Sequence, residues 1–210
     1  KTLIYYQAGL ASDLMSFYLS KREFYGEAQG LAQRIEGVLQ SLENINWDEV
    51  AGQLDNLGIP LDKAELKEGT RYELSIALEK YYNTQYDIDK EKKYADVQYD
   101  AVIKKYGGEK EAKAKHPNNY FLALLDRDVL DTVLAENLGE ALERLADHSE
   151  EAFGYSRSIV PSNLRMLVRE YLIASAYLGR LDMATKAIDG NPDLSRAFWS
   201  MDSLTLLWLF

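Results

Sequence analysis

Six tyrosines stand close together in the middle of the chain, and their type and spacing suggest a binding role. They lie between positions 81 and 106 of a chain that has 15 tyrosines among 210 residues. A tyrosine combines a large apolar ring with a polar hydroxyl, which suits interfaces and ligand grooves as well as the half-buried margin of a helical bundle. The candidate interface or ligand groove consists of Tyr81, Tyr82, Tyr86, Tyr94, Tyr99 and Tyr106.

Conventional catalytic chemistry has little support in this sequence. Cysteine is absent, and neither of the two histidines, His116 and His148, stands in the His-x-x-x-His or Glu-x-x-His spacing that carboxylate-bridged metal sites use. We expect His116 in an exposed charged loop and His148 at a solvated helix end. No phosphate-binding glycine motif and no nucleophile elbow is present. The sequence therefore predicts no catalytic residue, no metal site and no cofactor.

The acidic residues are numerous, but they do not single out a site. The chain has 34 Asp and Glu against 24 Lys and Arg, a net charge of −10, which argues against a nucleic-acid partner. We interpret Asp126, Asp128 and Asp131 as acids that complement the positive end of a helix dipole. An enzyme that uses carboxylates and tyrosines alone is the weakest of the functional alternatives.

The clearest helical pattern covers residues 1–45, where apolar residues recur with alternating spacings of four and three, interrupted by Lys21 and, further upstream, by Gln7. Such spacing keeps one apolar seam along a helix. We favour a single helix of about 42 residues, roughly 63 Å long; the alternative is a hairpin that breaks near Ser20–Gly26. Gly26, Gly30 and Gly37 would allow a neighbouring helix to approach closely. The seam consists of Leu10, Leu14, Phe17, Phe24, Ala28, Leu31, Ile35, Val38, Leu42 and Ile45.

The rest of the chain also shows helical patterns. Asn46, Asp62 and Asn191 are expected N-caps, and all four prolines fall at predicted breaks. Gly69 is expected to interrupt the helical pattern, and residues 71–78 have a strand as the alternative. Helices are expected over 88–106, over 119–145 with a possible break at Asp126 or Gly139, and from 163 onward. The predicted fold is all-α: a helical bundle or an array of helical hairpins, with a long N-terminal helix.

The charged run Glu109–Lys115 is the expected exposed connection between two parts. These are an N-terminal helical part, 1–115, and a C-terminal part of helical hairpins, 116–210, unless the two form one continuous domain. Within the second part, Ala176–Ala184 and Asn191–Pro192 resemble the turn and the terminal proline of a tetratricopeptide hairpin. Ala184 and Pro192 are only eight residues apart, about one turn too few for the full repeat. The resemblance therefore implies a helical hairpin and no function.

These observations favour a non-enzymatic α-helical interaction or scaffold protein, in a bacterial envelope or a multi-protein assembly. We expect a protein partner or a homo-oligomer through the N-terminal helix. No membrane-spanning segment is expected, because no apolar run approaches about 20 residues. The absence of cysteine favours an extracytoplasmic, periplasmic location over the cytoplasmic alternative. The main functional alternative is a helical ligand-binding or sensor domain cut from a membrane-anchored protein.

Overall fold

The computed structural model describes residues 3–201, with side chains described from residue 7 onward. This part of the chain contains eleven α-helices and no strand, which confirms the all-α prediction. Contacts between Cα atoms divide the chain into two compact units, residues 1–112 and 113–210. The division after residue 115 that the sequence suggests stays a prediction about domain organisation.

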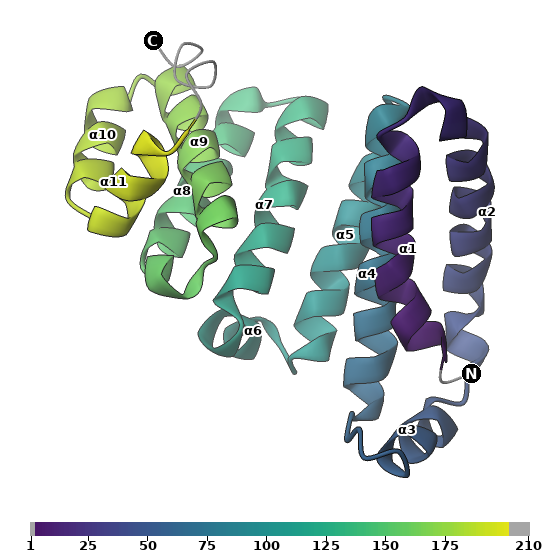
Figure 1. Cartoon of the computed structure of the whole chain (residues 1–210). Helices are drawn as coiled ribbons and strands as arrows, with labels where there is room; N and C mark the ends of the chain where they lie inside the picture. Colours follow the sequence, from purple (N-terminus) through teal and green to yellow (C-terminus); the bar gives the residue numbers. More distant parts are fainter. Residues whose placement is uncertain (1–2, 202–210) are drawn as a thin grey trace. The chain divides into compact units, whose positions relative to one another are not determined.

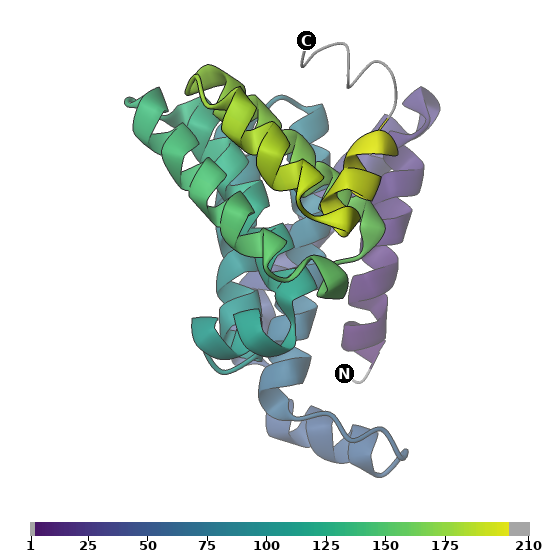
Figure 2. The ribbon, with the colours of Figure 1, turned by 90° about the vertical axis from the view of Figure 1, so that its left-hand side faces the viewer.

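The first unit is built around one central helix, α4 (Lys63–Thr84). Two antiparallel helices, α1 (Leu3–Leu19) and α2 (Tyr25–Ser41), pack on it, and α5 (Ile88–Lys105) runs back along it (Figure 1). The short α3 (Trp47–Asp55) and the loop that follows project sideways from the end of α4 (Figure 2). This arrangement gives α4 a neighbour on several sides.

The N-terminal region is a hairpin, so the single long helix expected from the sequence is wrong and its alternative is observed. The break lies at Ser20–Phe24, where Lys21 is extended (φ −135°, ψ 119°) and precedes a 3-10 turn. Phe17 and Phe24 pack across the break, with ring centroids 5.6 Å apart. A helix of 42 residues would run well past α4, which has 22. Folding back at Lys21, the polar interruption of the seam, lets both halves pack on α4.

Residues 71–78 are helical, and the alternative of a strand is wrong. They lie within α4, which also runs without interruption through Gly69 and Thr70, where the sequence suggested a break. Asp62 caps this helix as expected, because its Oδ1 accepts a hydrogen bond from the Glu65 N–H at 2.7 Å. The Thr70 hydroxyl donates back to the Leu66 carbonyl at 2.7 Å. Burial of both Gly69 and Thr70 holds α4 continuous there.

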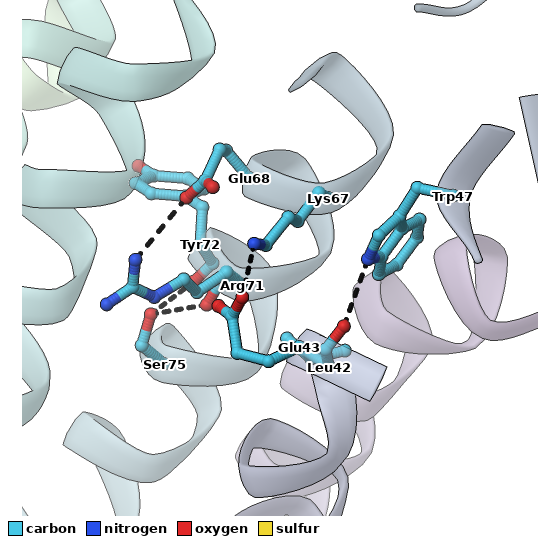
Figure 3. Close-up of polar contacts among 8 residues, drawn as sticks. All are labelled: Leu42, Glu43, Trp47, Lys67, Glu68, Arg71, Tyr72 and Ser75. Atoms are coloured by element: carbon cyan, nitrogen blue, oxygen red, sulfur yellow. Dashed lines mark hydrogen bonds and ion pairs between the residues drawn. The ribbon is translucent and has the colours of Figure 1, made fainter. Parts of the chain in front are cut away.

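The corner where α2, α3 and α4 meet has a small core of its own. Figure 3 shows the polar contacts beside it. The Trp47 indole N–H donates to the Leu42 carbonyl at 3.0 Å, and Lys67 Nζ lies 2.6 Å from Glu43 Oε2. One turn further along α4, Arg71 pairs with Glu68 at 3.5 Å. The first two contacts fix the residues just after α2 against α3 and α4, whereas the Arg71–Glu68 pair lies within α4. The buried residues of this corner core are Leu42, Trp47, Val50, Leu54 and Leu66.

The second unit consists mainly of antiparallel helices. They are α7 (Pro117–Leu134), α8 (Leu138–Phe153), α9 (Pro161–Tyr177), α10 (Leu181–Asp189) and α11 (Pro192–Trp199), with a 3-10 turn η3 (Ser156–Ser158) before α9. Within this unit α8 packs on α7 and α9, while α10 and α11 pack on α9 (Figure 1).

Several predicted breaks in this region coincide with helix ends, but one expectation is wrong. Glu109–Lys115 is a helix, α6, with Ala112 fully buried, where an exposed connection was expected. The break in the 119–145 pattern lies at 135–137, just before Gly139, because Asn137 caps α8. The apolar C-terminal segment Leu204–Phe210 lies outside the described residues.

Candidate functional site

Helix α1 carries more apolar surface than the core of its own unit covers. Ala8 and Met15 are buried, at 1% and 0% exposed. The three seam residues on the outward side of the helix remain 65%, 40% and 48% exposed: Leu10, Leu14 and Phe17. We call these three residues the α1 ridge. Large apolar groups that lie together at a surface typically mark an interaction site.

An open groove of about 360 Å³ runs between α1 and α2, with α4 as its floor. Its lining is almost entirely apolar. The Arg34 side chain at its edge donates through Nε to the Gly30 carbonyl at 3.1 Å, within its own helix. We call this space the α1–α2 groove; it is lined by Gln7, Ala8, Ala11, Leu31, Arg34, Ile35, Val38 and Leu74.

The ridge and the groove form one continuous surface. At 3.6 residues per turn, Leu14 lies only about 20° around α1 from Gln7. Gln7 lines the groove, and so does Ala11 on the side nearer the core. The ridge therefore begins beside Gln7, where the α1 wall of the groove ends. Both ends of the groove are held, by the Phe17–Phe24 contact at the hairpin turn and by the corner core at the end of α2.

The predicted seam thus has different surroundings in its two halves. On α2 its residues Ala28 and Ile35 are buried, as ordinary core packing requires. On α1 the same register gives the exposed ridge. No other helix approaches the glycines of α2 in the described part of the chain. Apart from adjacent residues and the backbone of α2 itself, no atom there lies within 4 Å of a Cβ placed at Gly26, Gly30 or Gly37. The close helix approach expected at these glycines is therefore not observed within this part.

Two of the six candidate tyrosines form a buried cluster with an acid from another helix. The rings of Tyr82 and Tyr94 stack with centroids 5.7 Å apart, and both hydroxyls donate to Glu36 Oε1, at 2.7 and 2.8 Å. Burial alone would raise the pKa of Glu36. The two hydrogen bonds and the nearby charges of Lys90 and Lys93 lower it by more, so the pKa of Glu36 falls below its usual value. The cluster connects α2 to α4 and α5.

The other four candidate tyrosines have different surroundings. Tyr81 packs edge-on against Tyr82, with ring centroids 5.0 Å apart. Tyr86, which follows α4, is 90% exposed and has a positive φ of 55°. Tyr99 and Tyr106 lie half-buried further along the chain. The structure therefore brings Tyr81, Tyr82 and Tyr94 together and leaves Tyr86 apart. A role for the six as one interface or ligand groove stays a prediction.

Removing either hydroxyl of the cluster should weaken the first unit. We expect Tyr82→Phe and Tyr94→Phe each to lower the free energy of unfolding by about 1–2 kcal/mol, because each hydroxyl donates to a charged, half-buried carboxylate. Urea unfolding followed by circular dichroism measures this. Tyr86→Phe is the matched control and should change nothing. Equal stability of all three variants would show that the Glu36 hydrogen bonds contribute nothing.

A buried acid–histidine pair in the second unit is the feature that the sequence analysis missed. Asp128 is 2% exposed, and its Oδ2 lies 2.5 Å from Nδ1 of the half-buried His148 on α8. Arg127 lies 3.7 Å from the other carboxylate oxygen. The hydrogen bond to Asp128 raises the pKa of His148, and burial opposes it only partly. Both expectations are wrong here: His148 is not at a solvated helix end, and Asp128 lies inside α7, away from its start.

One sequence signal could have revealed this pair. Phe121, Leu124, Leu125 and Asp128 follow the spacing of one helix face, and the first three are fully buried. An acid that continues an apolar face needs a partner, because an isolated buried charge is costly. His148 is the residue that approaches it from α8.

A second set of buried polar groups lies between α4 and α5. Burial raises the pKa of Glu79 to about 6, although the Gln98 amide donates to its carboxylate. Nearby, Asn83 Nδ2 donates to Glu91 Oε1 at 2.6 Å, and Glu91 is only 8% exposed. These residues hold two helices together through polar groups, which helical periodicity alone does not predict.

Among the described residues, no group of three or more His, Asp or Glu is placed to hold a metal ion. No helix in this same part is both long enough and apolar enough to cross a membrane. No protein-family model, curated protein or solved structure matches the chain.

Proposed function

We propose that this chain is a non-enzymatic α-helical interaction protein that associates with a second copy of itself through the α1 ridge and the α1–α2 groove. One observation carries the proposal: Leu10, Leu14 and Phe17 are exposed on the same helix whose Gln7, Ala8 and Ala11 line an apolar groove. Exposing three large apolar side chains in one place costs solubility unless a partner covers them. A helix face inserted into an apolar groove is a common form of recognition.

A second copy fits this surface because ridge and groove are neighbours on one face. In a twofold arrangement, the ridge of each copy enters the groove of the other, so that one contact is made twice. Leucine and phenylalanine side chains would then pack against Ala11, Leu31 and Val38, the apolar groove residues that are still partly or fully exposed. We place such a scaffold in a bacterial envelope, as part of a larger assembly. The absence of cysteine favours the extracytoplasmic location, where free thiols are a liability.

Charging the ridge should dissociate the dimer. In size-exclusion chromatography with light scattering, we expect the unaltered chain to approach twice its 23.9 kDa as concentration rises. Leu10→Glu and Leu14→Glu should each raise the dissociation constant at least about tenfold, because each removes buried apolar area and places a charge there. The folding of each variant is checked by circular dichroism.

Leu57→Glu is the matched control for this experiment. Leu57 is 70% exposed, close to the 65% of Leu10, but it follows α3 and does not line the groove. We expect this variant to dimerise like the unaltered chain. A strict monomer at the highest soluble concentration would refute self-association, and equal dissociation by Leu57→Glu would show that the contact lies elsewhere.

A further inference from the structure

A second open cavity, of about 410 Å³, lies in the second unit where η3 and the start of α9 meet α11. Its base is apolar and firmly packed: Ile159, Leu164 and Ala197 are 5%, 4% and 6% exposed. Its rim, in contrast, is polar and strongly charged. The cavity therefore combines a fixed apolar floor with charged groups at the opening, an arrangement typical of a site for a ligand with one ionic end.

Three arginines from three elements surround this cavity: Arg157 of η3, Arg165 of α9 and Arg196 of α11. Arg157 and Arg196 each lie 3.9 Å from the carboxylate of Asp193. Arg165 forms no ion pair with any residue in the described part of the chain. Three guanidinium groups and one carboxylate leave a local charge of plus two, although the whole chain carries −10.

The contacts to Asp193 leave most of the arginine donors available. Both distances are near the limit of an ion pair, and the side chains of Arg157 and Arg196 are 94% and 82% exposed. Exposed pairs of this kind contribute little free energy. Asp193 therefore serves as a weak internal counter-ion that a better oxyanion can displace.

Two further groups at the rim suit an oxyanion. The Ser156 hydroxyl accepts a hydrogen bond from Asn191 Nδ2 at 3.4 Å, so its own proton remains to be donated. Pro161 at the rim begins α9, and Val160 before it supplies no side-chain cap to the first turn. The positive end of that helix dipole adds to the field of the arginines.

We propose that this cavity binds a phosphate monoester. Guanidinium groups match phosphate oxygens in pairs, and a phosphate monoester carries about −1.5 to −2 at pH 7, which balances the local charge. The volume exceeds that of a phosphate alone, and the apolar floor receives the carbon substituent of the ester. The same chemistry is found in a small metabolite and in a phosphorylated side chain.

The experiment titrates the full-length chain with phenyl phosphate, O-phosphoserine and a phosphoserine peptide. Calorimetry and amide chemical shifts measure the binding. Inorganic phosphate and acetate serve as the comparison anions. We expect the esters to bind more tightly than inorganic phosphate, and acetate most weakly. Tighter binding of phenyl phosphate than of the peptide identifies a small-molecule ligand, and the reverse identifies a phosphorylated protein segment. Acetate binding as tightly as the esters overturns the proposal, and so does the absence of binding.

Two variants separate this site from a general attraction to anions. Arg165→Gln should weaken ester binding about tenfold, because it removes a charge-assisted pair of donors. Asp193→Asn should instead strengthen binding severalfold, because the internal counter-ion is gone, and a misfolded variant would not show this gain. Arg180→Gln, which removes an arginine that pairs with Glu143 away from the cavity, should leave binding unchanged. No gain with Asp193→Asn would overturn the proposed site.

Discussion

Replacing Trp47 by alanine should lower the free energy of unfolding by about 3–5 kcal/mol, the usual cost of removing a large buried aromatic side chain. Trp47 is 3% exposed and packs with Leu42, Val50, Leu54 and Leu66 in the corner core. Its removal leaves a cavity at the point where α2, α3 and α4 meet. Urea unfolding followed by circular dichroism measures the loss without relying on tryptophan fluorescence.

Two further substitutions divide this effect into its parts. Trp47→Phe keeps an aromatic ring but removes the N–H that bonds the Leu42 carbonyl at 3.0 Å, and should cost about 1–3 kcal/mol. Lys67→Met removes only the ion pair with Glu43, whose side chain is 69% exposed, and should cost less than about 1 kcal/mol. If Trp47→Ala cost no more than Lys67→Met, the corner core would not be what holds α2 on α4.

Replacing His148 by alanine should cost about 2 kcal/mol, because it leaves the Asp128 carboxylate buried without its nearest partner. Asp128→Asn removes that uncompensated charge. We therefore expect Asp128→Asn to destabilise the unaltered chain but to restore part of the stability of His148→Ala. The double-mutant cycle tests this directly. Simple addition of the two losses would show that the pair does not interact.

The contribution of His148 should also depend on pH in a defined direction. The pKa of His148 is raised in the folded chain, so the folded state binds the proton more tightly than the unfolded state does. The stabilisation is therefore fully present below the unfolded pKa, 6.5, and is lost as pH rises through the folded value. The difference between the unaltered chain and His148→Ala should shrink between mildly acidic and mildly alkaline pH. A constant difference, or one that grows, would contradict the assignment.

The N-terminal hairpin shows where sequence reasoning succeeds and where it ends. The alternating spacing correctly indicates helix on both sides of Lys21, because it depends on residues a few positions apart. Whether the chain continues straight or folds back at Lys21 depends on the length of α4, a helix more than forty residues away. The same limit applies to the six tyrosines, because the acid that joins Tyr82 to Tyr94 is Glu36, on another helix.

The sequence by itself determined the all-α fold, most helix positions and several helix starts. Asn46, Asp62 and Asn191 cap helices as their residue types predict, through bonds to N–H groups two or three residues away. Only the tertiary structure decided which faces are covered: it exposes Leu10, Leu14 and Phe17, and it pairs Asp128 with His148. The reason is physical. Helices and caps arise from local bonds, whereas burial and pairing depend on which distant helices pack together.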